Sequence, residues 1–363
     1  MKSKIPSRSI QVVTIKDVAK AAGVSPSTVS KVLTDNGYSA SAATSKKVQQ
    51  AAKQLGYVPD SSARNLRSRR SGQIGIVLNE LDSSGRSMAL QISGVQMSSL
   101  EIVQISFDGA VLAGLTGAIR RHKQGSFVIY PQPTNPEDDD ISRYMDRRVE
   151  GFIIRTDPRT PNHLIHELDP RRIPMVALWT RDVPSGVGYS DIDHKGGAKL
   201  AIQHLIDLGH RRIAYYGDGQ NSGNTHFALR HEGYLEALKD AGLSPSNQTG
   251  YVQDAKQLRD LLSASEPVTA VFSPTDLQAA ELSQDLINLG VRIPDDISMV
   301  GFDDIFGSDF IAGGLTTIYH PVREMAEMAV DNLMALIRGE SLVKCRTAIP
   351  TRLIIRASSK QIP

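Results

Sequence analysis

The chain has 363 residues, enough for more than one hydrophobic core, and a single cysteine, Cys345. One cysteine excludes an internal disulfide and any CxxC metal site, and it is typical of a protein in a reducing cytoplasm. No apolar run is long enough for a signal peptide or a membrane span, and no GxSxG, HExxH or GxxxxGKS/T motif indicates an enzyme. We therefore expect a cytoplasmic protein that is not an enzyme and holds neither a cofactor nor a metal.

The net charge of +2 hides an uneven distribution along the chain. Residues 1–72 hold thirteen Lys and Arg against three acidic residues, a net charge of +10, which leaves −8 for residues 73–363. A basic segment attracts the phosphate backbone of DNA through counterion release, whereas an acidic body stays off the DNA. The distribution favours a DNA-binding head over the alternative of a merely solvated basic face.

Residues 13–33, VTIKDVAKAAGVSPSTVSKVL, predict two short helices. Thr14 and Asp17 form a capping-box pattern at the start of the first helix, and Gly23 ends it. Ser25 can cap the second helix, with Pro26 at its first position. Each helix has an apolar stripe, formed by Ile15, Val18, Ala19 and Ala22 in the first and by Val29, Val32 and Leu33 in the second. The pair predicts a helix-turn-helix whose second helix enters a major groove, although an ordinary helical hairpin has a similar pattern.

A third helix is predicted between Ser41, which can cap it, and Gly56, which ends it. Its apolar stripe consists of Val48, Ala51, Ala52 and Leu55. The segment that follows, PDSSARNLRSRRSG, is polar and basic and contains one large apolar residue, Leu66. It is either a disordered tether or a helix that shows Leu66 alone on a basic surface.

The body of the chain alternates short β-branched runs with amphipathic helical stretches. The runs cover residues 74–78, 126–130, 151–155, 173–179, 211–217, 269–273 and 297–302. Such alternation indicates βαβ units and parallel sheets that are covered on both faces. About 290 residues exceed what one core usually fills, so we expect two α/β lobes. A ligand would bind in the cleft between them, at the carboxyl ends of the strands.

Several stretches resemble the LacI/GalR family of bacterial transcriptional repressors, in family order and spacing from about Thr14 to Ser358. They are TIKDVAKAAGVSPSTVSKVL, VQQAAKQLGYVPDSSARNL, HLIDLGHRRIAYYG, LGVRIPDDISMVGFDD and LTTIYHPVREMAEMAVDNL. The resemblance implies a small all-α helix-turn-helix headpiece (1–59) and a hinge helix that folds on operator DNA (60–72). It also implies an α/β core of two lobes (73–363) that resembles type I periplasmic binding proteins, binds an effector and dimerises.

The resemblance further implies which residues contact operator DNA. The major-groove face falls on Ser25, Pro26, Ser27, Thr28, Ser30 and Lys31, and the phosphate-contacting positions fall on Thr14, Thr34, Thr44 and Tyr57, with Ile15, Tyr38 and Ala63 completing the set. Leu66 corresponds to the hinge leucine that wedges into the minor groove, where the contacts made by kinked DNA offset the cost of unstacking. The turn TDNGYSASA is one residue longer than the commonest family form.

For the effector, the resemblance implies contacts from Arg230, Asp303 and the Thr275 position, with Asn224 and His320 lining the same site. Arg155 ends the predicted strand 151–155, so we expect it at the carboxyl edge of the sheet, beside the same site. Charged donors and acceptors of this kind suit a polyhydroxylated ligand, because they replace the water bound to its hydroxyl groups.

Neighbouring residues have simpler structural interpretations. Asp276 is better explained as a helix cap than as a ligand contact, and Asp304 as a structural residue. His320 could equally pack beside Pro321 at a strand end. Residues 210–212 predict a surface turn without a ligand role.

Residues 79–108 depart most clearly from the family pattern. Relatives pass from the first strand through a short Asn-Pro-Phe-Phe-like segment into a helix, whereas here the helix is predicted to begin near Gly109, after about 25 additional residues. The aromatic residue that normally closes over the effector is missing unless Phe107 takes its place.

These features predict a DNA-binding transcriptional repressor whose operator affinity is controlled by a sugar or a sugar derivative. A purine or nucleoside effector is the alternative, but it would want an aromatic stacking partner, of which the sequence offers few near the cleft. A solute-binding protein would carry an export signal and no basic head, and an α/β enzyme with a DNA-binding head would need a catalytic constellation that the sequence lacks.

The expected partners follow from this function. Two headpieces together read a pseudo-palindromic site on double-stranded DNA, so we expect a homodimer bound to the bacterial nucleoid. No apolar heptads follow the last strand, so a coiled-coil tetramer is not expected. No contact with a membrane is expected.

Overall fold

The structure is a computed structural model that describes residues 13–34, 40–57, 71–78, 89–92, 95–129, 148–156, 164–217, 225–244 and 251–362. The chain divides into two compact units, Met1–Ser71 and Gly72–Pro363. No helix within the described residues is both long enough and apolar enough to span a bilayer.

The first unit contains three helices, α1 (Ile15–Ala22), α2 (Pro26–Thr34) and α3 (Ala42–Leu55). Helices α1 and α3 end at Gly23 and Gly56, whose φ angles of 66° and 65° are left-handed and therefore favour glycine. The three helices pack on a small apolar core that includes Val18, Val29 and Val48. The predicted helices and caps of this unit are confirmed, and so are the apolar stripes except at Leu55, which is exposed at the end of α3.

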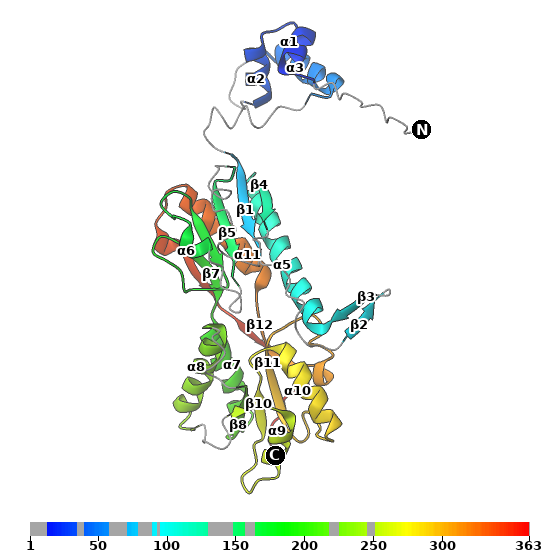
Figure 1. The fold of residues 1–363 in the computed structure, drawn as a ribbon, viewed down its shortest axis with the longest axis vertical. Helices are drawn as coiled ribbons and strands as arrows, with labels where there is room; N and C mark the ends of the chain where they lie inside the picture. The colour runs from blue at the N-terminus through cyan, green and yellow to red at the C-terminus, as the bar shows by residue number, and fades with distance from the viewer. Residues whose placement is uncertain are drawn as a thin grey trace, which may run out of the picture. The chain divides into compact units, whose positions relative to one another are not determined.

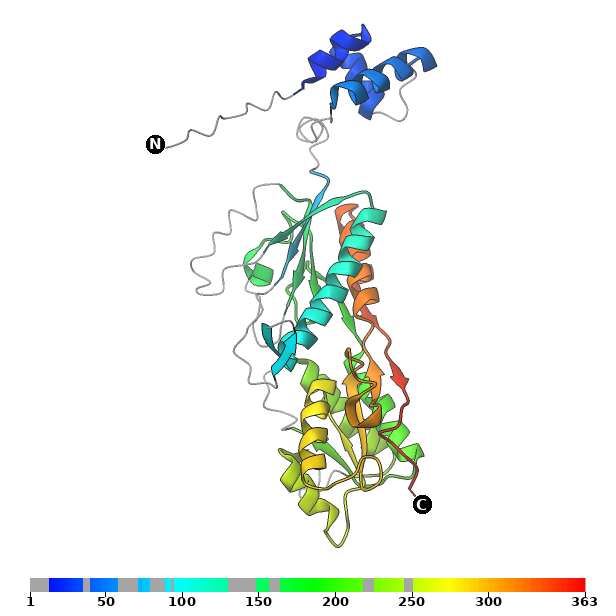
Figure 2. The same cartoon turned by 90° about the vertical axis from the view of Figure 1, so that its right-hand side faces the viewer.

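The second unit contains two six-stranded sheets, each the centre of one lobe (Figure 1). The first sheet has the strand order β13 (Arg346–Ile349), β7 (Gly188–Ile192), β6 (Met175–Leu178), β5 (Gly151–Arg155), β1 (Gln73–Val77), β4 (Gly125–Ile129), with parallel pairing throughout. Helices α5 (Ser99–Arg121) and α11 (Val322–Ile337) lie side by side on one face, and α6 (Leu164–Glu167) packs on the other (Figure 2). Because both faces are covered, β5 is apolar and buried up to Ile154, and even Arg155 at its end is buried.

The second sheet has the strand order β14 (Arg352–Ile354), β12 (Thr316–Tyr319), β11 (Ser298–Asp303), β10 (Ala270–Phe272), β8 (Ile213–Tyr216), β9 (Tyr251–Val252). Its pairs are parallel except β12 with β14. Helices α7 (His194–Asp207) and α8 (Thr225–Asp240) cover one face, and α9 (Ala255–Leu262) and α10 (Asp276–Asn288) cover the other (Figure 1). Short 3-10 turns at Ile311–Gly313 and Leu342–Cys345 complete the described elements.

Within the described residues, the chain passes from one sheet to the other at three places: between β7 and α7, between β12 and α11, and between β13 and β14. Each lobe is therefore built from separated parts of the sequence, and the three crossings form the junction between the lobes. The two predicted α/β lobes and all seven predicted strands are confirmed, and no strand bound differs by more than two residues.

Two expectations about the core are wrong. The first long helix of the core, α5, begins at Ser99 rather than near Gly109, and it follows an antiparallel hairpin of β2 (Ala89–Ile92) and β3 (Val95–Ser98). The β-branched residues before Gly109 suggested no helix, but their helix propensity is lower than that of alanine by only about 0.5 kcal/mol each. His210 is not in a surface turn: it is buried and hydrogen bonds Thr269 and the carbonyl oxygen of Lys360.

Gly114 lets α5 approach α11 closely, and this contact yields a stability prediction. A Cβ at Gly114 would lie 2.6 Å from the carbonyl oxygen of Arg323 and 2.8 Å from Cβ of Ala326, whereas a Cβ at Gly117 would meet nothing within 4 Å. We expect Gly114→Leu to lower the free energy of unfolding by about 1–3 kcal/mol, the usual cost of overpacking. Gly117→Ala is the control and should be neutral or stabilising by about 0.5–1 kcal/mol. Urea unfolding measures both, and equal midpoints for the two variants would contradict the packing described here.

Candidate functional site

Helix α2 presents a face of short hydroxyl side chains on the headpiece. Ser25, Ser27 and Lys31 are exposed, whereas Val29 on the opposite side is fully buried. Ser25 Oγ accepts the backbone N–H of Thr28 at 3.1 Å and hydrogen bonds the hydroxyl groups of Ser27 and Thr28. The cap therefore fixes the start of the helix and gathers three hydroxyl groups at its exposed end.

The flanking positions of the headpiece have more mixed surroundings. Thr14 is exposed, and both its N–H and its hydroxyl donate to Asp17. Ile15 and Tyr57 pack against the headpiece core, and the hydroxyl of Thr44 hydrogen bonds that of Ser41. Thr34 ends α2; the predicted contacts Tyr38, Ala63 and Leu66, and residues 60–70 of the predicted hinge, lie outside the described residues.

At the junction between the lobes, Arg230 of α8 is held by three acceptors. Its Nη2 donates to Asp303 Oδ1 at 2.8 Å, its Nε donates to His194 Nδ1 at 3.2 Å, and its Nη1 donates to the carbonyl oxygen of Pro274. The guanidinium also lies 3.7 Å from the ring centre of Phe302. Only 5% of the Arg230 side chain and 11% of the Asp303 side chain are exposed, so this ion pair is largely removed from water.

A second chain of hydrogen bonds joins Asp303 to the first lobe. His320, in the crossing between β12 and α11, approaches Asp303 Oδ1 with its Nδ1 at 3.4 Å. Its Nε2 accepts the indole N–H of Trp179 at 2.9 Å, and Trp179 directly follows β6. Since Nε2 accepts, the neutral ring carries its proton on Nδ1, where Asp303 accepts it. The bonds from Arg230 to Trp179 therefore form one connected path across the junction.

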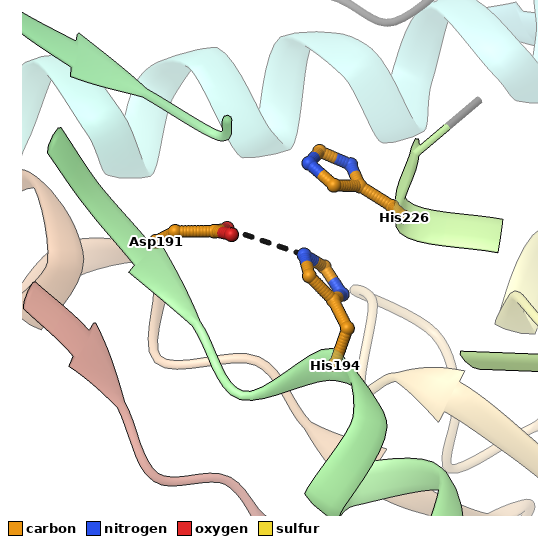
Figure 3. Close-up of side chains that lie close together, drawn as sticks. All are labelled: Asp191, His194 and His226. Carbon is orange, nitrogen blue, oxygen red and sulfur yellow. Dashed lines mark hydrogen bonds and ion pairs between the residues drawn. The ribbon is translucent and has the colours of Figure 1, made fainter. Parts of the chain in front are cut away.

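Two further histidines and a carboxylate lie close together (Figure 3), and one of them, His194, contacts Arg230 of this path. Asp191 on β7 accepts from His194 Nε2 at 3.2 Å, and its other oxygen accepts from Arg181 Nε at 3.1 Å. The His226 ring, from the start of α8, stacks on that of His194 with the ring centres 4.2 Å apart. The ligand atoms of Asp191, His194 and His226 all lie within 4.8 Å of one another, a spacing at which a metal ion could be considered.

Aromatic side chains line the first-lobe side of the junction. Phe107 of α5 packs edge-on against Trp179 and His320, with ring centres 5.9 Å and 5.6 Å away. Arg155 lies over the Trp179 ring at 4.7 Å and pairs with Asp108 at 3.2 Å. The expectation of few aromatic partners near the site is therefore wrong, and Phe107 does lie among the site residues.

The structure also corrects the roles expected next to α10. Thr275 is the N-cap of this helix, because its hydroxyl accepts the N–H of Gln278 at 3.1 Å. Asp276 is therefore not the cap. It is fully buried at the first helical position and accepts from the hydroxyl groups of Thr317 and Ser308. Asp304 pairs with Arg356 at 2.8 Å, a structural contact as expected, and Asn224 lies outside the described residues.

Backbone strain gathers at the same strand ends. Trp179 has a φ of 64° and Asp303 a φ of 118°, values that non-glycine residues rarely adopt. Such conformations persist where the surroundings hold them, and they concentrate at binding sites. Both residues belong to the hydrogen-bonded path between the lobes.

Burial and pairing set the charges of these groups. Burial alone would raise the pKa of Asp303, but the Arg230 guanidinium and the bond from His320 hold that pKa below its usual range. Burial lowers the pKa of His194 well below its usual value and lowers that of His226 to about 4. The site therefore combines an ionised pair, Arg230 with Asp303, and neutral imidazoles.

Sequence reasoning placed Arg230, Asp303, His320 and Arg155 at one site, and the structure brings these four side chains to the junction. It missed Trp179, Asp191, His194 and His226. Trp179 carried a usable signal, since it ends a predicted strand just as Arg155 does. Asp191 and His194 carried none, because the strand GYSDI is too polar and too short to be recognised.

Comparisons with known proteins agree with this architecture. Residues 14–60 match the family of bacterial regulatory proteins called the lacI family, and residues 202–359 match the periplasmic binding protein-like domain. The ribose operon repressor of Escherichia coli strain K12 is 31% identical over 356 residues, which cover 95% of this chain and 99% of that protein.

Two solved structures share the fold. The transcriptional regulator CelR in complex with cellobiose has 27% identity and a TM-score of 0.62, covering 95% of this chain and 99% of that one. The Lac repressor dimer bound to operator and the anti-inducer ONPF has 23% identity and a TM-score of 0.72, covering 96% of this chain and all of that one. The fold thus defines a helix-turn-helix headpiece with a periplasmic-binding-protein-like core.

The chain belongs to the lacI family of bacterial regulatory proteins. It is a DNA-binding transcriptional repressor.

The lowered pKa of His226 predicts a dependence of stability on pH. The folded state keeps His226 neutral down to about pH 4, whereas the unfolded chain protonates it below about 6.5, so stability is lost as the pH falls through this window. The contribution of His226 should reach about 1.4 kcal/mol per pH unit. We expect His226→Gln to flatten the fall between pH 6.5 and 4.5 by up to this amount, measured by urea unfolding. His166→Gln, at an exposed position of α6, is the control, and equal slopes for the two variants would refute the assignment.

Proposed function

We propose that the effector is a sugar or a sugar derivative that binds at the junction between the lobes, against Arg230 and Asp303. The observation that carries this proposal is the buried pair itself: a guanidinium from the second turn of α8 and a carboxylate at the end of β11, joined through His320 to Trp179 of the first lobe. A polyhydroxylated ligand can replace these bonds one for one, since each hydroxyl group both donates and accepts. The relatives named for ribose and cellobiose support the same ligand class.

Trp179 and Phe107 favour a second candidate, a purine or a nucleoside. An aromatic base stacks on such rings, and the two rings lie beside the proposed polar contacts. A sugar presents its C–H groups to the same surfaces. A thermal-shift screen with D-ribose, cellobiose, guanine and adenosine separates the two classes: a ligand at 100 times its dissociation constant adds about 2.7 kcal/mol to the apparent stability.

Control of DNA affinity requires that the ligand prefer one arrangement of the lobes, since equal affinity for both shifts nothing. The bonds that a ligand would replace lie beside a chain crossing, because their shared partner His320 stands in the crossing between β12 and α11. A ligand that exchanges these bonds for its own therefore acts where the lobes are joined. We infer that this exchange changes the spacing of the two DNA-binding segments in a dimer.

We also propose that two copies of this chain bind one pseudo-palindromic operator. A single headpiece buries little surface and reads few bases, whereas two give a site long enough for a genomic search. The Lac repressor, solved as a dimer on its operator, supports this arrangement. Such a protein acts on the chromosome, so we place it in the bacterial cytoplasm at the nucleoid, and we assign it no catalytic role.

The DNA-binding proposal assigns different roles to α2 and to its flanks. Ser27→Ala or Lys31→Ala should change which operator bases are preferred, at about 1–3 kcal/mol for each lost base contact. Tyr57→Phe removes one hydroxyl at a proposed phosphate-contacting position, so it should weaken binding to all sequences alike. Selection from a randomised operator library measures both effects. An unchanged preference profile in the Ser27 and Lys31 variants would show that α2 is not the recognition helix.

The effector proposal predicts a repressor that no longer switches. Asp303→Asn keeps the volume of the side chain and removes its charge, so sugar affinity should fall about 10- to 150-fold, as expected when roughly 1.5–3 kcal/mol of charge-assisted hydrogen bonding is lost. Operator affinity without sugar should stay within about threefold. Asp304→Asn is the matched control, because Asp304 pairs with Arg356 instead. Fluorescence anisotropy of labelled operator, with and without sugar, gives both numbers. If Asp303→Asn responds like the wild type, the effector binds elsewhere.

A further inference from the structure

Asp191 and His194 form a buried pair that the proposed effector contacts do not use. Both residues have 0% exposure, and they stand on either side of the first crossing between the lobes. Asp191 is the second-last residue of β7 in the first lobe, and His194 is the first residue of α7 in the second lobe. A carboxylate is costly to bury, so its position calls for a physical reason.

The hydrogen bonds around His194 admit one arrangement of its proton. Arg230 Nε is a donor without acceptor capacity, so His194 Nδ1 must present its lone pair at 3.2 Å. The proton of the neutral ring then sits on Nε2, where Asp191 Oδ1 accepts it at 3.2 Å. A carboxylate only accepts, so Asp191 selects the tautomer that Arg230 requires.

We propose that Asp191 is a positioning residue for the effector site, which fixes the His194 tautomer and through it the orientation of Arg230. His194 is the acceptor for Nε of the guanidinium, whereas Pro274 and Asp303 hold its two ends. Without the acceptor at Nε, the guanidinium can turn about the axis through its ends and lose its alignment. Asp191 is itself anchored by Arg181 at 3.1 Å. This proposal rests on the proposed role of Arg230 in binding the effector.

A divalent metal ion is the competing occupant, because Asp191, His194 and His226 lie within ligand distance of one another. Three features of the site disfavour it. Coordination by His194 Nε2 would move the ring proton to Nδ1, against the N–H of Arg230. The Arg230 cation lies beside the ring. Finally, the His194 and His226 rings stack with only 21° between their planes, so their in-plane lone pairs do not converge on one ion.

Asp191→Asn tests the proposal, because the surroundings dictate how the amide must sit. Arg181 can only donate, so the amide oxygen faces Arg181 and the amide NH₂ faces His194 Nε2. His194 must then accept at Nε2 and carry its proton on Nδ1, opposite the N–H of Arg230. The variant changes no side-chain volume, yet it reverses the bond that orients the guanidinium. Asp207→Asn, at an exposed helix position, is the matched control.

Nitrogen-15 NMR of the histidine rings and of the Arg230 Nε–H in the full chain is the primary readout, with His194→Gln used to assign the signal. In the wild type and in Asp207→Asn we expect the Nε2–H tautomer of His194 and a slowly exchanging Arg230 Nε–H. In Asp191→Asn we expect the Nδ1–H tautomer and exchange at least about tenfold faster. A wild-type His194 protonated on Nδ1 or on both nitrogens overturns the proposal, even where the variant does not fold. An unchanged Arg230 signal in a folded variant does the same.

Two further measurements, of sugar binding and of metal binding, separate this proposal from the sugar proposal and from a metal site. If D-ribose or cellobiose binds the wild type, its affinity should fall about tenfold in Asp191→Asn, and unchanged affinity beside an altered spectrum overturns the positioning role. If neither sugar binds the wild type, the sugar proposal fails while the spectra still decide the role of Asp191.

Zn²⁺ and Ni²⁺ should shift the melting temperatures of wild type and His226→Gln equally. A rise confined to the wild type would establish a metal site instead.

Discussion

The ion pair between Arg230 and Asp303 is the constraint on which the junction depends. A guanidinium and a carboxylate that are nearly removed from water lose hydration worth several kcal/mol for each ion, and they are tolerated only when every donor finds an acceptor. The surrounding residues supply those partners: Pro274 and His194 for Arg230, and His320 for Asp303. The ion pair within the second lobe is therefore fully partnered, and His320 links it to Trp179 of the first lobe.

This constraint links structure to regulation. Apolar contacts at the junction would offer a polar ligand nothing to bind. Hydrogen bonds at the junction can instead be replaced by hydrogen bonds to a ligand, so that no charged group is left unpaired. The strained backbones of Trp179 and Asp303 also favour a binding site here, since both residues lie at strand ends and make these hydrogen bonds. The headpiece depends on none of this, because its helices pack on their own small core. The proposed ligand site and the proposed recognition helix thus lie in different compact units of the chain.

Local chemistry explains why much of the fold could be predicted. The headpiece helices are capped by adjacent residues, such as Ser41 before α3 and Gly56 after it, and buried strands such as β6 and β10 consist of apolar residues. The edge strand β13 was not predicted, because a short segment with polar residues pairs only once a distant strand is in place. The start of α5 was missed for a related reason: its first turns are β-branched, and helix propensity is a weak guide against tertiary context.

The candidate site likewise combines residues that the sequence indicates with residues that only the tertiary structure brings together. Arg230 and Asp303 follow recognisable sequence stretches, but the partners that complete them are distant in sequence: Trp179 lies 141 residues from His320, and His194 lies 36 residues from Arg230. The distinction between Thr275 and Asp276 also depended on tertiary structure, since either residue type can cap a helix. Asp276 is drawn inward by hydroxyl groups of β12 and of the loop after β11.

The central claim is that the junction acts as one hydrogen-bonded unit, and a double-mutant cycle tests it most directly. Trp179→Phe removes the indole N–H, Asp303→Asn removes the carboxylate, and the two residues share His320 as their common partner. If the path is continuous, the free energies of unfolding of the two single variants and the double variant should show a coupling of about 0.5–3 kcal/mol. Additivity within about 0.3 kcal/mol would show that the two bonds are independent and would contradict the account.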